Sequence, residues 1–495
     1  IFLTEATIFA MQITSAFIFA MSVMRPTPRI LVAAWTSRVT SRAAAPRRAT
    51  SIMRPLHSLA TDADNTELAE SSPSTFSPKS SFLKILQERG FLHQCTDLEA
   101  LDEKFSTQCV TGYLGFDATA SSLHVGSLLQ IMLLRHLQSC GHKPLVLLGG
   151  GTTKIGDPSG KDESRKMLTA DDIDANVKGI GSVFTKFLTF GSGESDAMIV
   201  NNDEWLSDLK YLEFLRDYGP HFTINRMLTF DSVRLRLERE QPLTLLEFNY
   251  MIFQAYDFLE LNRRYSCTVQ FGGSDQWGNI INGVELNRRV DGNAVFGVTA
   301  PLITTSDGRK MGKSASGAVW LNADLLSPYD YWQFWRNTED SDVGRFLRLF
   351  TDLSMDEIAK LEVLEGAAIN EAKVVLADEC TGLLHGVECL ESIKATAASL
   401  FDKGASEDSV DDLPRIFVST SEVEEGKFVV DLLVALKLAS SKSEARRSIK
   451  GGGARIDGNK IEDEKMQLES ADLEVSSQVR LSVGKKRHGI VEITQ

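Results

Sequence analysis

A strand–helix–strand pattern between residues 110 and 151 constrains the fold more than any other feature of the chain. Residues 110–116 (VTGYLGF) read as a strand, a polar turn (DATASS) follows, and an apolar helical stretch covers about 123–139. Residues 144–148 (PLVLL) then read as a short buried strand that leads into three glycines. Two strands joined by a helix at this spacing predict a βαβ unit of a parallel sheet. We therefore expect an α/β fold with ligands at the carboxyl ends of the strands.

Changes in composition along the chain predict further domains and linkers on either side of this unit. A Ser/Thr/Asp/Pro-rich stretch precedes a helix-like segment at 82–89, residues 328–400 are helix-like and acidic, and 406–414 is again rich in Ser, Asp and Pro. The last part, from about 427, holds 13 basic and 10 acidic residues. We expect a leader over 1–61, linkers over 62–80 and 411–426, an α/β domain over 81–335, an all-α domain over 336–410 and a small α+β module over 427–495.

Charge is spread unevenly and limits the partners. The net charge is −14, yet residues 1–61 hold seven Arg and one acid, so the remainder carries −20. A basic, acid-poor leader is typical of an organellar transit peptide that is cleaved after import. The acidic remainder excludes nucleic-acid binding by bulk charge, so such binding needs local basic patches.

Two compositional features narrow the class of protein further. The stretch 16–24 has 9 residues that are apolar apart from Ser22, whereas a membrane helix needs about 20. The six Cys residues include no C-x-x-C pair, which predicts reduced thiols and no metal site.

Two short segments suit phosphate groups. In LHVGS (123–127), His124 and Gly126 stand at an expected helix N-terminus, where free amides favour anions. In DGRKMGKS (307–314), Lys310 and Lys313 lie on a glycine-bearing loop, where they can follow charge onto a leaving group. The spacing of its glycines does not match a P-loop. Each segment alone also fits an ordinary turn.

Three other segments carry polar groups in unusual places. GGTTKIGDPSGK (150–161) must turn repeatedly and offers Asp157 to an ammonium group. In YMIFQAYD (250–257), helical spacing places Tyr250, Gln254 and Asp257 on one face. VQFGGSDQWGN (269–279) reads as a strand end that breaks into a polar loop.

Together these segments resemble tyrosyl-tRNA synthetases of the bacterial and organellar type, which are class I synthetases. LHVGS is similar to the HIGH motif and KMGKS to the KMSKS loop, while YLGFDATA, IGDPSGK, YMIFQAYD and QFGGSDQWGN are typical of the tyrosyl branch. The likeness covers nearly all of 80–495 in family order. It implies a Rossmann-like parallel-sheet catalytic domain at 81–335, which makes tyrosyl-adenylate from tyrosine and ATP and passes the tyrosyl group to the terminal ribose of tRNA(Tyr).

The resemblance also assigns residues. It implies that the tyrosine phenol lies between Tyr113 and Asp257, and that the ammonium is bound by Asp157, Tyr250 and Gln254. It places His124, Gly126, Lys310, Lys313 and Gln276 in catalysis. For ATP it implies a larger set, which is Asp117, Thr119, His124, Gly126, Gly273, Asp275, Lys310, Met311 and Lys313, with Asn225 as a supporting group.

The implied chemistry needs no covalent enzyme intermediate. The tyrosine carboxylate attacks the α-phosphate of ATP and displaces pyrophosphate with Mg²⁺ bound, so positioning and electrostatic support carry the catalysis. No protein-bound metal or organic cofactor is expected. Two positions depart from the family pattern, because Ser127 replaces the second His of HIGH and Leu114 replaces a polar or thiol group near the ribose.

The C-terminal module has its own basic segment, SKSEARRSIKGGGAR (441–455). Ser441 and Glu444 read as a capping box that opens a helix. The segment resembles an RNA-binding module named after a ribosomal protein, which implies tRNA contacts by Lys442, Arg446, Arg447, Lys450 and Arg455. A solvated basic face is the plain alternative.

Several alternatives stay open at this point. A non-enzymatic RNA-binding or splicing paralogue on the same scaffold, and a related synthetase for tryptophan or another nucleotidyl transferase, also fit parts of the pattern. The resemblance implies a homodimer. The leader favours the mitochondrial matrix, with a plastid or dual address as the alternative.

Overall fold

The computed structural model describes residues 76–159, 168–306, 308, 311–314, 317–401, 413–424, 426–468, 478–484 and 487–494. The expected leader (1–61) lies outside the described residues, as does the expected linker 62–80 apart from its last five residues. Among the helices that the structure does describe, none is long and apolar enough to cross a bilayer.

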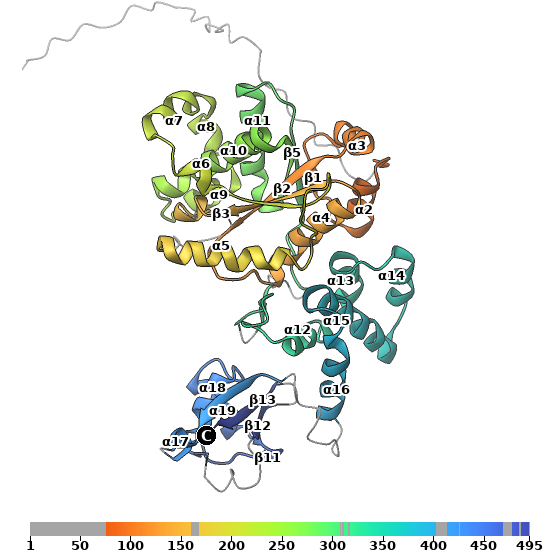
Figure 1. Cartoon of the computed structure of the whole chain (residues 1–495), viewed down its shortest axis with the longest axis vertical. Helices are drawn as coiled ribbons and strands as arrows, with labels where there is room; N and C mark the ends of the chain where they lie inside the picture. The colour runs from red at the N-terminus through yellow and green to blue at the C-terminus, as the bar shows by residue number, and fades with distance from the viewer. Residues whose placement is uncertain are drawn as a thin grey trace, which may run out of the picture. The chain divides into compact units, whose positions relative to one another are not determined.

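A six-stranded sheet forms the centre of the α/β domain, in the order β1-β6-β5-β2-β3-β4. Its labelled strands β1, β2, β3 and β5 lie among helices in Figure 1. Five strands run parallel and β1 pairs antiparallel with β6. β2 has β3 on one side and β5 on the other, so the crossovers leave it in opposite directions, which is where such sheets bind ligands. The strands are β1 (Gln94–Cys95), β2 (Thr111–Asp117), β3 (Lys143–Gly149), β4 (Met198–Asn201), β5 (Cys267–Gly273) and β6 (Phe296–Ala300).

The predicted βαβ unit is confirmed. β2 and β3 are joined by α4 (Leu128–Ser139), which a single 3₁₀ turn at Val125–Ser127 precedes. Alternate side chains of β2 enter different cores, with Tyr113 on one face of the sheet and Leu114 and Phe116 on the other. A strand buried on both faces is expected in a doubly covered parallel sheet, and the expected α/β class is therefore correct.

Helices complete the two layers. The face with Tyr113 is covered mainly by α10 (Leu245–Tyr265) and α11 (Trp277–Val290). The short helices between β4 and α10 form an insertion. The remaining helices of this domain are α2 (Ser81–Arg89), α3 (Leu98–Thr107), α5 (Ala170–Phe184), α6 (Asp203–Leu206), α7 (Tyr211–Asp217), α8 (Ile224–Met227) and α9 (Asp231–Glu238).

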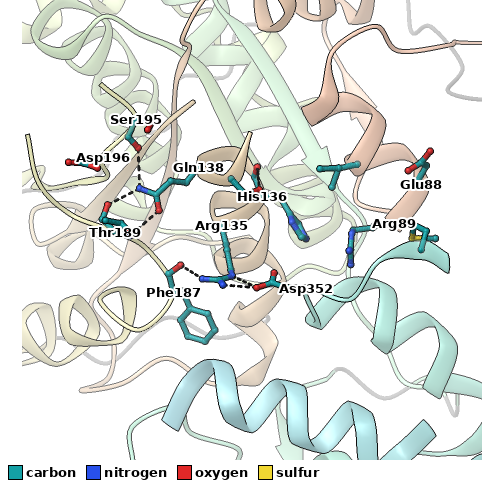
Figure 2. Close-up of a pocket in the computed structure, with 13 residues that line it drawn as sticks. Glu88, Arg89, Arg135, His136, Gln138, Phe187, Thr189, Ser195, Asp196 and Asp352 are labelled. Atoms are coloured by element: carbon teal, nitrogen blue, oxygen red, sulfur yellow. Dashed lines mark hydrogen bonds and ion pairs between the residues drawn. The ribbon is translucent and has the colours of Figure 1, made fainter. Parts of the chain in front are cut away.

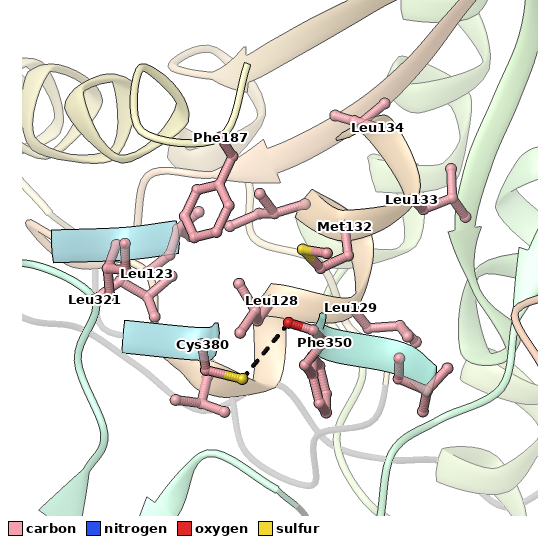
Figure 3. Close-up of a cluster of buried hydrophobic side chains, with 14 of the residues drawn as sticks. Leu123, Leu128, Leu129, Met132, Leu133, Leu134, Phe187, Leu321, Phe350 and Cys380 are labelled. Carbon is pink, nitrogen blue, oxygen red and sulfur yellow. Dashed lines mark hydrogen bonds between the residues drawn. The ribbon is translucent and has the colours of Figure 1, made fainter. Parts of the chain in front are cut away.

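An all-helical region follows and packs directly on α4. Leu128, Leu129 and Met132 of α4 share one apolar cluster with Phe350 and Cys380 (Figure 3). This packing explains why α4 is apolar around most of its circumference. The helices are α12 (Pro328–Arg336), α13 (Val343–Phe350), α14 (Met355–Glu362), α15 (Ile369–His385) and α16 (Cys389–Phe401).

Polar contacts also join α13 to the α/β domain (Figure 2). Arg135 of α4 donates two hydrogen bonds to one carboxylate oxygen of Asp352, at 2.8 and 2.6 Å. Arg89, which ends α2, donates to the carbonyl oxygens of Arg348 and Thr351, both at 2.9 Å. Arg89, Arg135 and Asp352 line a surface hollow of about 690 Å³.

The C-terminal module is a five-stranded sheet with helices, in the order β11-β10-β12-β13-β9. The expected linker 411–426 is wrong in part, because it contains β9 and α17. β9 pairs parallel with β13 and buries Val418. The elements are β9 (Arg415–Ser419), α17 (Thr420–Glu424), α18 (Val429–Ala435), α19 (Lys442–Lys450), β10 (Ala454–Ile456), β11 (Asn459–Lys460), β12 (Gln478–Val483) and β13 (Arg487–Thr494).

Candidate active site

A cavity of about 410 Å³ opens at the carboxyl ends of β2 and β5. This is the edge of the sheet at which the chain order reverses, as the topology requires. The structure brings most of the expected site residues to this one cavity. Those that line it are Tyr113, Asp117, Thr119, His124, Asp157, Tyr250, Gln254, Asp257, Gly273, Asp275 and Gln276.

Asp257 lies at the closed end of the cavity, on α10. This helix starts at a capping box in which Thr244 and Glu247 bond each other's backbone amides, so its register is fixed from its first turn. The Asp257 side chain is 1 % exposed. Its two carboxylate oxygens accept hydrogen bonds from Trp205 Nε1 at 2.7 Å and from Asn202 Nδ2 at 2.9 Å.

Burial raises the pKa of both polar groups at this end. It raises the pKa of Asp257 to about 7, although the bonds from Asn202 and Trp205 act in the other direction. It also raises the pKa of the Tyr113 phenol far above its ordinary value, so that phenol stays protonated. The Tyr113 hydroxyl is buried and has no hydrogen-bond partner among the residues that the structure describes. Because buried polar atoms are almost always bonded, this hydroxyl is available to a ligand.

Asp117, the last residue of β2, lines the cavity and accepts hydrogen bonds from two of its neighbours. One of its carboxylate oxygens accepts hydrogen bonds from Thr152 Oγ1 at 3.1 Å and from Tyr250 Oη at 3.2 Å. Asn202 also donates to Thr152 Oγ1, at 3.0 Å. The loop after β3, the loop after β4 and α10 are thus joined by one network before any ligand arrives.

A second chain of hydrogen bonds borders the open side. Gln276 Nε2 donates to Asp157 at 2.9 Å, and Asn279 Nδ2 donates to both Gln276 Oε1 and Gln254 Oε1 at 3.0 Å. The network presents the Asp157 carboxylate and two amides around the same space. These are the groups that hold an ammonium ion and orient a neighbouring carboxylate.

His124 caps the 3₁₀ turn that leads into α4, and Gly126 lies within that turn. The Gly126 amide donates to His124 Nδ1 at 3.0 Å, so a neutral imidazole carries its proton on Nε2. A Cβ atom added to Gly126 would lie 2.8 Å from the Met311 carbonyl oxygen. Gly126 is therefore required for the close approach of the KMGKS segment, in which Gly312 has a φ of +109°.

Some expected residues fall elsewhere or are not described. Met311 is buried and does not line this cavity. Lys310 lies outside the described residues, and only the backbone of Lys313, in β7 (Lys313–Ser314), is described. Asn225 is exposed on α8 and does not line the cavity. The two departures from the family pattern, Leu114 and Ser127, both line it.

Sequence reasoning missed several groups of the site. Asn202 and Trp205 bind Asp257 directly, and Gln270 of β5 and Trp320 also line the cavity. The signal for Asn202 was present, because polar residues follow β4 just as they follow β2 and β5 at the same edge of the sheet. Trp205 gave no such signal, since its position on a four-residue helix looks like ordinary packing.

The expected RNA-binding residues lie on α19 and at β10. Lys442 pairs with Asp431 at 2.8 Å and Lys450 with Glu464 at 3.2 Å, while Arg455 donates to the carbonyl oxygen of Gly458 at 3.0 Å. Two other residues of the set, Arg446 and Arg447, are exposed on α19. Over the described ranges there is no group of three or more His, Cys, Asp or Glu residues that would hold a metal ion.

Comparisons with known proteins identify the family of the chain. Residues 106–402 match the family of class I tRNA synthetases for tryptophan and tyrosine, and 406–491 match the C-terminal domain of tyrosine--tRNA ligases. The chain is 60 % identical over 414 residues to the tyrosine--tRNA ligase of Zymomonas mobilis, covering 84 % of this chain and 98 % of that protein. It is 58 % identical to the enzyme of that name from Caulobacter sp. strain K31, with the same coverage.

A solved structure supports the same assignment. The C-terminally truncated mitochondrial tyrosyl-tRNA synthetase of Aspergillus nidulans superposes with a TM-score of 0.59 at 31 % identity, over 65 % of this chain and 94 % of that one. The chain therefore belongs to the class I tRNA synthetases, on the branch of the bacterial and organellar tyrosine enzymes.

Proposed function

We propose that this protein activates L-tyrosine with ATP and transfers the tyrosyl group to tRNA(Tyr). The observation that carries the proposal is the closed end of the cavity. There the protonated Tyr113 hydroxyl has no partner within the described part of the chain, and the Asp257 carboxylate accepts hydrogen bonds from two donors. A phenol fits between them, because its oxygen accepts from one group while its proton goes to the other. A site that hydrogen-bonds a substrate hydroxyl rejects the analogue without it, a rule for which tyrosyl-tRNA synthetases are themselves the standard example.

The rest of the cavity orders the reacting groups. With the phenol at Asp257, the ammonium lies at Asp157, Tyr250 and Gln254. The tyrosine carboxylate then points toward Gln276 and the end that carries His124. His124 Nε2–H faces the phosphates, while Gly273 and Asp275 border the ribose. Attack of the carboxylate on the α-phosphate gives tyrosyl-adenylate, and pyrophosphate leaves toward Lys310 and Lys313.

Mg²⁺ enters this scheme as part of the substrate MgATP. The carboxylates of the cavity already accept hydrogen bonds, Asp117 from Thr152 and Tyr250, and Asp157 from Gln276. Such groups do not form a dedicated cage, and Mg²⁺ is commonly held through substrate phosphates.

Amino-acid-dependent exchange of pyrophosphate into ATP tests the proposal. We expect exchange with tyrosine. Exchange with tryptophan or another amino acid instead would assign a related synthetase. Absence of exchange with every amino acid would favour a non-enzymatic RNA-binding or splicing paralogue, an alternative that the relatives named above do not support.

For tRNA we propose a contact through the C-terminal module. Arg446 and Arg447 extend from α19 with exposed side chains. Phosphate contacts by such residues supply affinity, and recognition of the RNA is then largely by shape.

We also propose a homodimer. The segment between β4 and β5 exposes eight large apolar side chains, and exposed apolar surface of this kind marks sites of protein interaction when it is contiguous. They are Tyr211, Leu212, Ile224, Leu228, Leu235, Leu237, Leu245 and Leu246. Sedimentation of the wild-type protein and of Leu212→Asp tests this. A wild-type protein that sediments as a monomer would exclude the dimer.

The proposed location is the mitochondrial matrix. The Arg-rich, acid-poor composition of 1–61 supports import, and one similar solved structure is that of a mitochondrial synthetase. Cell fractionation, with mass spectrometry of the mature N-terminus, separates this location from a plastid or dual address.

A further inference from the structure

The segment 307–318 carries Lys310 and Lys313 and is named the lysine loop below. In the sequence it lies between residues 303–306 (the departing flank) and 319–321 (the returning flank), and both of these flanks are described in the structure, whereas Lys310 is not. Their contacts determine where the lysine loop stands relative to the cavity.

The returning flank is bound to the HIGH-like segment. The Val125 amide donates to the Val319 carbonyl oxygen, and the Leu321 amide donates to that of Leu123, both at 2.9 Å. The same flank continues into the loop itself, because the Val319 amide donates to Gly312 at 3.1 Å. These backbone hydrogen bonds fix the returning flank, and Gly312 with it, beside His124.

The departing flank is held by side chains of the helical region instead. The Ser306 amide donates to Asp342 Oδ2 at 2.8 Å. Arg345 donates to the Thr304 carbonyl oxygen, and it also pairs with Asp342 Oδ1 at 3.4 Å. Asp342 is 3 % exposed. A buried carboxylate that accepts a backbone amide is a strong, directional contact.

Asp342 is the N-cap residue of α13, and Arg345 lies in its first turn. α13 packs against α4. Its far end is tied by Arg89 and by the pairing of Arg135 with Asp352 (Figure 2). Its Phe350 packs in the apolar cluster under α4 (Figure 3). α4 is also the helix before which His124 and Gly126 stand. Because α13 contacts both α4 and residues 304–306, it fixes the departing flank relative to the HIGH-like segment.

We propose that Asp342 is a positioning residue for tyrosine activation. It fixes the departing flank so that the lysine loop meets the pyrophosphate in register with His124. This inference rests on the proposed function, in which the loop lysines stabilise the leaving pyrophosphate. It adds a residue of the helical region, remote from the cavity, to the groups that determine the rate.

Asp342→Ala tests the proposal in pyrophosphate exchange. We expect kcat to fall roughly 10- to 100-fold, because a displacement of about 1 Å of a catalytic group costs on the order of 10²-fold. Tyrosine affinity in equilibrium dialysis should stay within about twofold, since Asp257 and its partners are untouched. Asp340→Ala is the matched control, because Asp340 lies in the same turn but pairs with Lys373 at 2.5 Å.

Two further variants separate positioning from general loss of structure. If Asp342 acts through the lysine loop, Asp342→Ala combined with Lys310→Ala should be no slower than Lys310→Ala alone. Arg345→Gln, which removes the bond to the Thr304 carbonyl oxygen from a half-exposed side chain, should give a smaller loss of kcat with unchanged tyrosine affinity. Asp342→Glu should restore part of the rate.

Three results would overturn the inference. These are an unchanged kcat in Asp342→Ala, a parallel loss of tyrosine affinity, and losses that multiply in the double variant. A Lys310→Ala protein with wild-type kcat would contradict the proposed role of the lysine loop itself, and that outcome is distinguishable because it does not involve Asp342.

Discussion

Replacement of Asp257 by Asn tests the central feature of the cavity, because the substitution keeps the size of the side chain and removes its charge. The variant loses a hydrogen bond from the tyrosine phenol to a charged acceptor, a contribution of about 1.5–3 kcal/mol. The Asn amide also faces Trp205 Nε1 or Asn202 Nδ2, so one buried donor is left without an acceptor, at about 1–3 kcal/mol. The unpaired donor is present with and without substrate and therefore lowers the stability of the fold, whereas the lost bond to the substrate alone corresponds to about 10- to 200-fold in kcat/KM.

The assay is pyrophosphate exchange with tyrosine and with phenylalanine. We expect kcat/KM for tyrosine to fall by that factor and kcat/KM for phenylalanine to change little, so discrimination between the two amino acids collapses. Glu260→Gln serves as the control. Glu260 is buried on the same helix, but it pairs with Arg263 and Arg264 outside the cavity. Asp257→Asn enzyme that folds and still exchanges with wild-type kcat/KM for tyrosine would refute the assignment of this end of the cavity.

Three other predictions follow from contacts described above. Because the pKa of Asp257 is about 7 in the folded protein and 3.8 in an exposed chain, the folded state binds its proton more tightly. The free energy of unfolding should therefore drop by about 4 kcal/mol as pH rises from about 4 to about 7, and urea titrations near pH 5 and pH 8 should show roughly 2.6 kcal/mol of this drop in the wild type but none of it in Asp257→Asn. Gly126→Ala should raise KM for ATP and leave tyrosine affinity unchanged, since the new methyl group meets the Met311 carbonyl oxygen. Arg446→Ala and Arg447→Ala should each lower the salt dependence of tRNA binding by about one phosphate contact, with pyrophosphate exchange unaffected.

The parts of the site that follow local periodicity were predictable from the sequence. Tyr250, Gln254 and Asp257 share a helix face because their spacing matches the helical repeat, and the structure places all three on one cavity. The βαβ unit was equally accessible, since its two strands and helix are consecutive and each has a distinct apolar pattern.

Contacts between distant segments were not predictable in the same way. Asn202 and Asp257 are 55 residues apart, and Asp342 and Ser306 are 36 apart. Nothing in the local pattern of either segment identifies its partner. The strand β9 was missed for a related reason. Its few residues follow a Ser/Asp/Pro stretch, and it is stabilised by pairing with β13, which lies about 70 residues later in the chain.

The closed end of the cavity also explains why a carboxylate, rather than a neutral acceptor, serves there. Both oxygens of Asp257 already accept hydrogen bonds from Trp205 and Asn202, yet burial still raises its pKa to about 7. The charge is therefore incompletely compensated in the empty cavity, and a ligand O–H group supplies the missing donor. A phenyl ring fills the same volume without supplying it, so the charge remains uncompensated in a drier site. Selectivity for a phenol thus arises because the protein by itself stabilises the ionised form of Asp257 poorly, and a phenol O–H group improves that stabilisation.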